Sequence, residues 1–325
     1  MEGLKITKRP RLKNPVMIVA WPGMGEVASR AASYLVEKLK AEPFAEIVSS
    51  DFFYLVESAV QEGILQLPAL PANKFYFVKS KSAANDLIIL VSEAQPDLAL
   101  AQEYARLVLH VAASWKVKTI IGFAAMPQAI DHGQPSAVWF AATTPKIAEH
   151  LKKFGLQVFA DGHISGLNGL FLGLAKQEGF EGFCLLGEIP LYTIQIENPK
   201  ASCAVLEALN RILGMQIDLA PLSEQGKAME EQINGLLDYL KVGQSGGSAP
   251  GPIGEEEIEK IKKSLSQLTK LPLSIKEKID ALFTQAQADI SKANELKAEL
   301  DKWNVYKDYE DRFLDLFRRG KLDNN

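Results

Sequence analysis

The chain has 325 residues, of which 47% are apolar and 23% are charged, and its formal net charge is -4. These proportions are ordinary for a globular protein, so they exclude disorder along the whole chain, and the length accommodates two domains. The slightly negative charge excludes an overall basic field that would attract nucleic acid or an anionic membrane.

No apolar run reaches the roughly 20 residues that a membrane-spanning helix needs. The apolar stretch that follows the basic N-terminus, Val16–Trp21, is also too short for the core of a signal peptide. Only two cysteines are present, Cys184 and Cys203, and they give no disulfide framework. We therefore expect a cytoplasmic protein without a membrane span.

Strand-like and helix-like segments alternate from the N-terminus onward. Val16–Trp21 predicts a strand that is covered on both faces, and Pro22–Gly25 predicts a turn. From Glu26, apolar residues recur every four positions, which is typical of a helix with one broad apolar face. Phe52–Leu70 is hairpin-like. Further strands are expected at Glu46–Ser50, Lys74–Lys79, Asp86–Ser92, Val117–Phe123, Ala137–Ala142 and Gly182–Leu186, and helices at about Asp97–Ser114, Pro145–Phe154, Gly166–Gln177, Lys200–Leu213 and Leu222–Leu240. This alternation indicates an α/β sandwich around a largely parallel or mixed sheet.

The C-terminal part of the chain differs in composition from the part before it. Residues 242–254 are rich in glycine and proline, and they predict a flexible linker after a domain of residues 1–241. Residues 255–325 hold 29 of the 76 charged side chains. Pro272 ends a first helical pattern there, and a longer one begins near Ser274 and continues toward Trp303, with an aromatic face beyond it. We expect a charged amphipathic helical hairpin or a small bundle.

A glycine-containing turn between the first buried strand and its helix is the first candidate site. It comprises Trp21, Pro22, Gly23, Gly25 and Glu26. In an α/β sheet, backbone N–H groups at such a turn and the following helix N-terminus can bind an anion. The turn lacks the full dinucleotide-binding spacing of glycines and a Walker lysine, so it predicts neither a dinucleotide site nor a P-loop. The alternative is that Gly23 and Gly25 only permit a tight turn.

Two later elements add candidate residues. Asn168 and Gly169 lie in a second glycine-rich segment that leads into a helix; the glycine would allow a close approach, and the asparagine is a candidate cap or bridge. Glu188 lies at the end of a strand, where active sites of open sheets are found. A strand-end glutamate is also a common partner in an ion pair or a helix cap.

The histidines form no recognisable catalytic or metal-binding pattern. His110 is expected to pack within an apolar helix, whereas His150 is expected to be exposed. His132 and His163 lie in polar loops beside aspartates, and a metal site would require these loops to meet. Neither a paired cysteine motif nor a serine nucleophile elbow is present. We therefore predict no metal, no cofactor and no catalytic residue.

Three segments in this order resemble one known family. An apolar strand followed by WPGMGEVASRAASYL, then HISGLNGLFLGLAKQEGFEGFCLLGEIP, then a helix ending in RILGMQIDLAPL, is similar to the archaeal and bacterial branch of the proteasome assembly chaperones. The resemblance covers about residues 10–241. It implies a three-layer α/β/α sandwich similar to the nucleoside phosphorylase fold, and a homo-oligomer.

The resemblance also implies what the protein binds. Eukaryotic members help to assemble the α-ring of the proteasome, and some archaeal relatives dock through a C-terminal hydrophobic–tyrosine–any-residue tail. The last residues here, KLDNN, do not match that tail, so we do not expect docking by this route. The family supplies no catalytic residues to transfer to this chain.

Two functions remain open at this stage. The leading hypothesis is a non-enzymatic protein-binding or assembly factor, with proteasome α-subunits as the candidate partner and no nucleic acid partner. The alternative is an enzyme or small-molecule binder of phosphorylase-like shape. In that case the turn at residues 22–26 would hold an anion, and Glu188 or Asn168 would contact a polar, nucleoside-like ligand.

Overall fold

The computed structural model describes residues 3–48, 50–53, 58–61, 63–67, 69–80, 85–243, 273–302 and 305–319. In this part of the chain, the strands form one large mixed sheet and one separate hairpin. The strands of the large sheet are β1 (Leu4–Ile6), β2 (Val16–Ala20), β3 (Glu42–Ile47), β6 (Asn73–Val78), β7 (Leu87–Ser92), β8 (Thr119–Gln128), β9 (Val138–Ala142), β10 (Gln157–Val158) and β11 (Glu181–Pro190), and the hairpin pairs β4 (Ala59–Gln61) with β5 (Ile64–Gln66).

The central strands of the large sheet run parallel to one another. The order across the sheet is β1-β3-β6-β7-β2-β8-β11-β9-β10. Strand β2 is parallel to both β7 and β8, and β11 is parallel to β8. The outer pairs β1/β3, β3/β6, β6/β7 and β9/β11 are antiparallel. The amino ends of the four parallel strands therefore share one edge of the sheet, and their carboxyl ends share the opposite edge.

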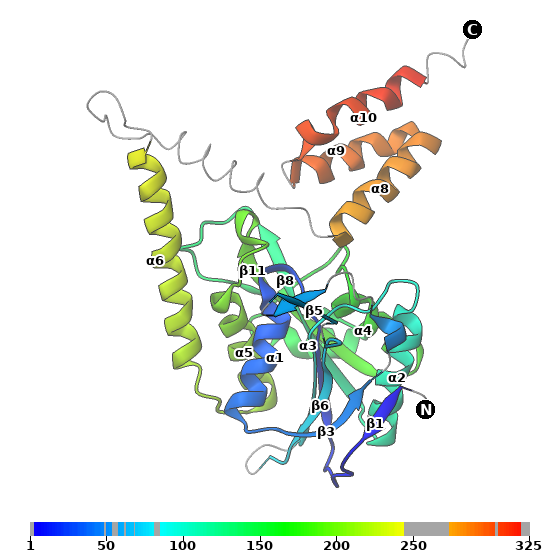
Figure 1. Cartoon of the computed structure of the whole chain (residues 1–325), viewed down its shortest axis with the longest axis vertical. Coiled ribbons are helices and arrows are strands. Elements are labelled where there is room, and N and C mark those ends of the chain that lie inside the picture. The colour runs from blue at the N-terminus through cyan, green and yellow to red at the C-terminus, as the bar shows by residue number, and fades with distance from the viewer. Residues whose placement is uncertain are drawn as a thin grey trace.

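Helices cover both faces of this sheet (Figure 1). The helices of the body are α1 (Val27–Lys38), α2 (Ala101–Ser114), α3 (Pro145–Lys152), α4 (Leu167–Gln177), α5 (Pro199–Leu213) and α6 (Ala220–Gly243). One face carries α1, α3 and α5, with α6 packed on α5, and the other face carries α2 and α4. The expected three-layer α/β/α sandwich is confirmed.

Alternation along β2 shows how the sequence divides the core between the two faces. All five residues of β2 are buried. Ile18 and Ala20 pack with α1 and α5, whereas Met17 and Val19 pack with α2 and α4. A central strand with helices on both sides has to be apolar at every position, which is the continuous apolar run that the sequence contains.

The tail contains three helices in the described residues. They are α8 (Leu273–Ala288), α9 (Ala293–Lys302) and α10 (Tyr306–Arg319), and each contacts the other two. The long helix expected from Ser274 toward Trp303 is wrong in one respect, because it is interrupted after α8. There the Asp289 carboxylate accepts the Ser291 N–H at 3.0 Å and caps the short helix η4 (Ile290–Lys292).

Part of the region between the body and the tail helices is not described by the structure. The linker was expected at residues 242–254, but residues 242 and 243 belong to α6; the rest of the linker and the first tail helix, before Pro272, lie outside the described residues. None of the helices that the structure describes combines the length and the apolar composition of a membrane span.

Candidate functional site

The candidate turn at residues 21–26 connects the carboxyl end of β2 to α1 and includes the short helix η1 (Met24–Glu26). Gly25 has a φ of 60°, and a Cβ there would lie 3.2 Å from the Ile189 side chain, so both its conformation and its surroundings favour glycine. The Gly25 N–H donates to the Ile194 carbonyl at 2.8 Å, and the Gly25 carbonyl accepts from the Asn198 N–H at 2.8 Å. The segment that follows β11 therefore holds the turn in place.

Asn168 joins the second glycine-rich element to this turn. Its side-chain oxygen accepts the Trp21 N–H at 3.0 Å, and its side-chain nitrogen donates to the Trp21 carbonyl at 2.9 Å. Asn168 is 4% exposed and Trp21 is fully buried. The amide therefore satisfies both backbone groups of a buried residue at the strand end, which water cannot reach. The sequence-based expectation that Asn168 caps or bridges identified the right residue, since it bridges α4 to β2.

Gly169 allows the loop before α4 to fold back on the helix. A Cβ at this position would lie 2.0 Å from the Ile164 carbonyl oxygen, a separation that no real pair of such atoms adopts. Gly173, one turn later on the same helix, has nothing within 4 Å of an added Cβ. The close approach is therefore specific to Gly169.

Gln95 is a bridging residue that the sequence analysis missed. Its side-chain nitrogen donates to the Pro22 carbonyl at 2.7 Å, and its side-chain oxygen accepts the Leu167 N–H at 3.0 Å. It follows the carboxyl end of β7, next to β2 in the sheet. Like Glu188, Gln95 is a polar side chain at the carboxyl edge of the parallel strands, the edge at which ligands bind in open sheets.

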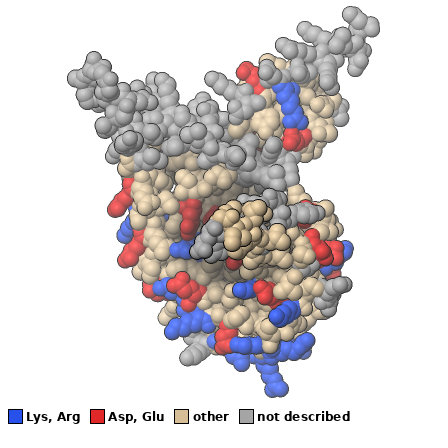
Figure 2. All heavy atoms as spheres, in the orientation of Figure 1, with Lys and Arg blue, Asp and Glu red and all other residues tan. Residues whose placement is uncertain are grey.

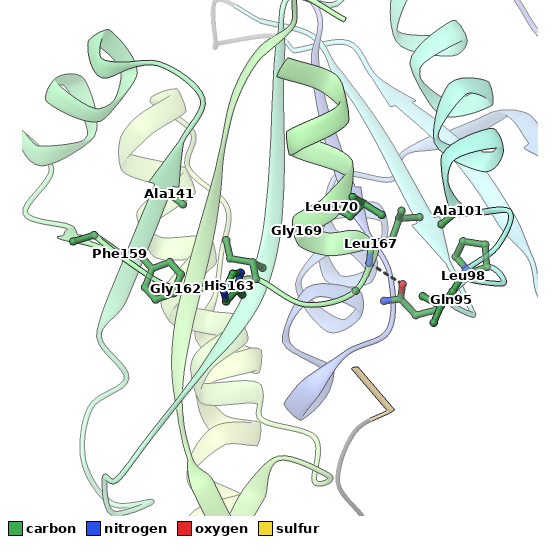
Figure 3. A pocket seen from close by; sticks show the side chains of 14 residues that line it. Gln95, Leu98, Ala101, Ala141, Phe159, Gly162, His163, Leu167, Gly169 and Leu170 are labelled. Carbon is green, nitrogen blue, oxygen red and sulfur yellow. Dashed lines mark hydrogen bonds between the residues drawn. The ribbon is translucent and has the colours of Figure 1, made fainter. Parts of the chain in front are cut away.

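A pocket of about 470 Å³ lies beside these bridges (Figure 3). In Figure 3 the Gln95 side chain points to the first residues of α4, and the loop of Gly162 and His163 forms the opposite wall. The remaining lining is mainly apolar or glycine: Pro96, Leu98, Ala101, Ala141, Phe159, Ala160, Ile164, Gly166, Leu167, Gly169 and Leu170. His163 is the one titratable side chain in this lining, so the pocket offers no acid and base pair.

Buried polar side chains form a hydrogen-bonded network beneath the carboxyl edge of the sheet, starting at Trp21. The Trp21 indole N–H donates to the Tyr104 hydroxyl at 3.2 Å, and that hydroxyl donates to the Asn73 side-chain oxygen at 2.9 Å. The Ser92 hydroxyl lies 2.5 Å from the same oxygen. Burial raises the pKa of Tyr104 to about 12, although its hydrogen bonds with Trp21 and Ser92 oppose this rise. Tyr104 therefore stays neutral and structural at ordinary pH.

Glu188 does not join the cluster of Trp21, Gln95 and Asn168. Its carboxylate accepts the Trp139 indole N–H at 2.7 Å and faces the Ala137 N–H at 3.4 Å. It lies within β11 and lines a second, smaller cavity together with His132. The first two glycine-containing elements thus meet, whereas the Glu188 side chain of the third lines a different cavity, although the adjacent Ile189 packs against Gly25.

His132 anchors the loop before β9. Its two ring nitrogens lie 2.8 Å from the Tyr192 hydroxyl and 2.8 Å from the Asn234 side-chain oxygen. The Lys200 ammonium donates to the His132 carbonyl at 2.7 Å and pairs with Glu230 on α6. These contacts fasten the loop to α5 and α6.

The expected packing of His110 is wrong. The residue lies on α2 but is exposed, because the apolar face of the helix is formed by its neighbours Leu109 and Val111. His150 is exposed as expected, with its ring 5.2 Å from that of Phe154. Within the described ranges, no three histidine, cysteine or acidic side chains come together as metal ligands.

A family model matches residues 17–237, which extend from β2 into α6. The model describes the PAC2 family. The chain belongs to the PAC2 family. The match covers the sheet from β2 onward and its helices, and it ends before the tail.

Relatives of this PAC2 protein agree with the assignment. An uncharacterized protein of Methanocaldococcus jannaschii is 28% identical over 77% of this chain and 93% of its own length. The crystal structure of Pyrococcus furiosus PbaB, an archaeal proteasome activator, is 29% identical, has a TM-score of 0.62, and covers 72% of this chain and 97% of that chain. Pyrococcus furiosus PbaA, an archaeal homologue of the proteasome-assembly chaperone, is 22% identical with a TM-score of 0.58, covering 83% of this chain and 100% of that chain. The resemblance drawn from the sequence motifs is therefore confirmed.

Proposed function

We propose that this PAC2 protein is a non-enzymatic, cytoplasmic factor that binds the proteasome through its α-subunits. The observation that carries the proposal is the similarity to the proteasome activator PbaB, which includes nearly the whole of that chain at 29% identity. The chemistry of the main pocket is consistent with a binding role, since its lining holds one titratable side chain and no acid and base pair.

An exposed apolar hairpin is the surface that we assign to this partner. Val60, Ile64, Leu65 and Leu67 of the β4–β5 segment are between 65% and 80% exposed, and we call these four residues the apolar hairpin surface. A group of large apolar side chains in water is a feature of protein interfaces. A partner that covers them would gain about 25 cal/mol for each Å² of apolar surface removed from water.

The hairpin extends from the edge of the sheet that carries the pocket. Asn73, which follows the hairpin, pairs with Ser92 at the carboxyl end of β7. Before the hairpin, the Phe52 carbonyl accepts the Asp97 N–H at 2.8 Å, next to the pocket residue Leu98. Leu98 is itself 57% exposed. The apolar hairpin surface and the rim of the pocket therefore lie on one side of the molecule.

Binding to purified proteasome α-subunits by size-exclusion chromatography tests the proposal. Wild-type protein should co-elute with α-subunits, and Leu65→Ser/Leu67→Ser should not. The matched control is Val158→Ser/Ile196→Ser, which removes two apolar side chains that are exposed outside the hairpin. Failure of the wild type to co-elute would refute the partner, and equal co-elution of both variants would refute the surface.

We also propose that the protein forms a homo-oligomer and that the tail takes part. The helices α8, α9 and α10 pack on one another, and beside them Ile290 and Leu314 stay 51% and 42% exposed, which leaves apolar side chains that a second copy could cover. Deleting residues 244–325 should leave a folded body, because the family match ends at residue 237, and should change the sedimentation coefficient by more than the lost mass explains. An intact chain that sediments as a monomer would contradict this proposal.

Small-molecule binding is the second candidate function. The pocket volume of about 470 Å³ is within the range of ligand sites, which is roughly 300–1,000 Å³. A panel of nucleosides, inorganic phosphate and common metabolites should then raise the melting temperature of the wild type. Leu170→Trp, which enlarges a side chain of the lining, should reduce this effect, whereas Glu188→Ala should not, because Glu188 lines the other cavity. A panel that raises the melting temperature nowhere would eliminate this candidate.

A further inference from the structure

Basic side chains gather at the amino edge of the sheet, opposite the pocket. The turns at this edge precede β2, β3 and β8, and they carry exposed cations. Figure 2 shows Lys and Arg concentrated at this lower end of the molecule. We name the following six exposed residues the basic edge: Arg9, Arg11, Lys13, Lys40, Lys116 and Lys118.

Two contacts bring the separate turns of the basic edge together. The Trp115 indole N–H donates to the Pro10 carbonyl at 3.0 Å, which places the N-terminal segment beside the turn of Lys116. The Lys13 N–H donates to the Asp86 carboxylate at 2.6 Å. The N-terminal cations therefore lie beside the turn of Lys116 and Lys118 even though more than 100 positions separate them in the sequence.

Acidic side chains offset this positive charge only in part: Glu37 lies three residues before Lys40, and the Glu181 N–H donates to the Lys118 carbonyl. In the described residues, none of the six cations makes an ion pair. Glu42 pairs with a different lysine, Lys8, at 2.8 Å. The carboxylate of Asp86 is buried and accepts the backbone N–H groups of Lys13 and Ser80. The local charge is thus opposite in sign to the net charge of -4 of the whole chain.

Backbone conformation gives a second, independent observation. Lys40 and Lys116 have φ values of 49° and 59°, a left-handed conformation that strains a residue with a Cβ. Both follow helix ends at which two N–H groups bond back to the last turn, the motif in which glycine is the usual residue. The same motif after α4 contains Gly179, with a φ of 84°. Lys40 and Lys116 therefore occupy left-handed positions on the basic edge at which glycine would be less strained.

We propose that the basic edge binds an acidic segment of a protein partner. Charge complementarity specifies the occupant, since six unpaired cations around short turns fit a run of aspartate and glutamate side chains. A nucleic acid fits less well. The Trp115 ring is half-buried and packs against Phe44 with 4.8 Å between the ring centroids, so the edge lacks the row of freely exposed aromatic rings on which successive bases stack. The remaining acidic surface would also repel a long polyanion, whereas a short segment experiences mainly the charges within roughly 10 Å.

Fluorescence anisotropy with three probes tests this proposal. The probes are a labelled 12-residue peptide of alternating aspartate and glutamate, a 12-nucleotide single strand, and vesicles with anionic lipid, each measured over a series of salt concentrations. The wild type should bind the peptide more tightly than the other two probes, and the affinity should fall with salt. Arg9→Glu/Arg11→Glu should weaken peptide binding at least tenfold. Lys146→Glu/Lys153→Glu, which reverses two exposed lysines on α3 and just after it, should leave the affinity unchanged.

The strained lysines provide a separate readout. Lys40→Gly/Lys116→Gly should raise the melting temperature, because glycine relieves the strain, and should weaken peptide binding at least threefold. A purely structural role of the two lysines predicts the rise without the loss of binding, and that result would overturn the argument from strain. Absence of peptide binding by the wild type, or tighter binding of the oligonucleotide or the vesicles, would overturn the proposed partner. These outcomes do not depend on whether the hairpin binds proteasome α-subunits.

Discussion

Replacing Asn168 by aspartate tests whether the bridge between α4 and Trp21 stabilises the candidate site. The substitution keeps an oxygen that can accept the Trp21 N–H, now 3.0 Å from the side-chain oxygen. It removes the N–H group that donates to the Trp21 carbonyl at 2.9 Å and puts a second oxygen in its place. Two oxygens that both lack hydrogen would then face each other in a site that is 4% exposed.

The magnitude follows from these two losses. A buried carbonyl left without a donor costs about 1–3 kcal/mol. Burial of the new carboxylate raises its pKa above the usual value of about 3.9, and each unit of this rise costs about 1.4 kcal/mol at neutral pH. We therefore expect Asn168→Asp to lower the free energy of unfolding by about 3–5 kcal/mol at pH 7.5. Because the protonated acid can donate to the Trp21 carbonyl, the deficit should shrink as the pH falls through the raised pKa.

Urea unfolding followed by tryptophan fluorescence measures this effect, since Trp21 is buried at the bridge. The variant and the wild type should be compared at pH 7.5 and pH 4.5. Asn198→Asp is the matched control: Asn198 caps α5 by accepting the Ala201 N–H at 2.9 Å, a role that aspartate performs equally well. A deficit for Asn168→Asp below 1 kcal/mol at pH 7.5, or one that does not shrink at pH 4.5, would refute the bridge as a source of stability.

Three further predictions follow from the described contacts. Gly169→Ala should lower the free energy of unfolding by about 1–3 kcal/mol, because the added Cβ meets the Ile164 carbonyl. Gly173→Ala on the same helix should be neutral or stabilising in urea unfolding. Equal effects of the two substitutions would contradict the close approach at Gly169. The pKa of Tyr104 is raised to about 12 in the folded protein, above the value of about 10 in the unfolded chain, so its stabilising contribution is complete below pH 10 and is lost as the pH rises toward 12. The free energy of unfolding of the wild type should therefore fall more steeply over this range than that of Tyr104→Phe. Parallel curves would refute the raised pKa of Tyr104. His132→Ala should speed hydrogen exchange in residues 129–137 while leaving β2 protected, because the loop loses the bonds of the His132 ring to Tyr192 and Asn234 and keeps the backbone N–H bond to Tyr192. Unchanged exchange would show that the loop is held by other contacts.

The sequence predicted most of the fold because local patterns specify it. The continuous apolar run of β2 and the four-residue spacing of α1 follow directly from burial on both faces of a strand and on one face of a helix. The full lengths of β8 and β11 did not follow, since their last residues include prolines and polar side chains and become strand only through pairing with each other, as Glu188 does with Met126. The short edge strand β1 depends in the same way on its partner β3.

The candidate site was predicted in part. Asn168 and the turn at Trp21 could be singled out one by one, but their contact across 147 positions is a property of the folded sheet. Gln95 was missed because it matches no sequence motif, and its position just after a parallel strand was the one signal that pointed to it. Glu188 was grouped with the turn on the argument that strand ends share an edge, yet that edge is broad enough to hold two separate groups of residues.

The strand order also constrains how the chain can fold during synthesis. Strand β2 is made early, but its two neighbours in the sheet are β7 and β8, which follow about 70 and 100 residues later. Strand β11, which covers the other side of β8, follows later still. The growing chain therefore has to keep this wholly apolar strand unpaired until β7 has emerged, and uncovered at its other edge until β8 has emerged. Contacts between segments so far apart in the sequence slow folding, and they prolong the time for which aggregation-prone intermediates are exposed. A PAC2 domain of this topology should itself depend on early helper contacts on the ribosome, most of all along residues 16–20.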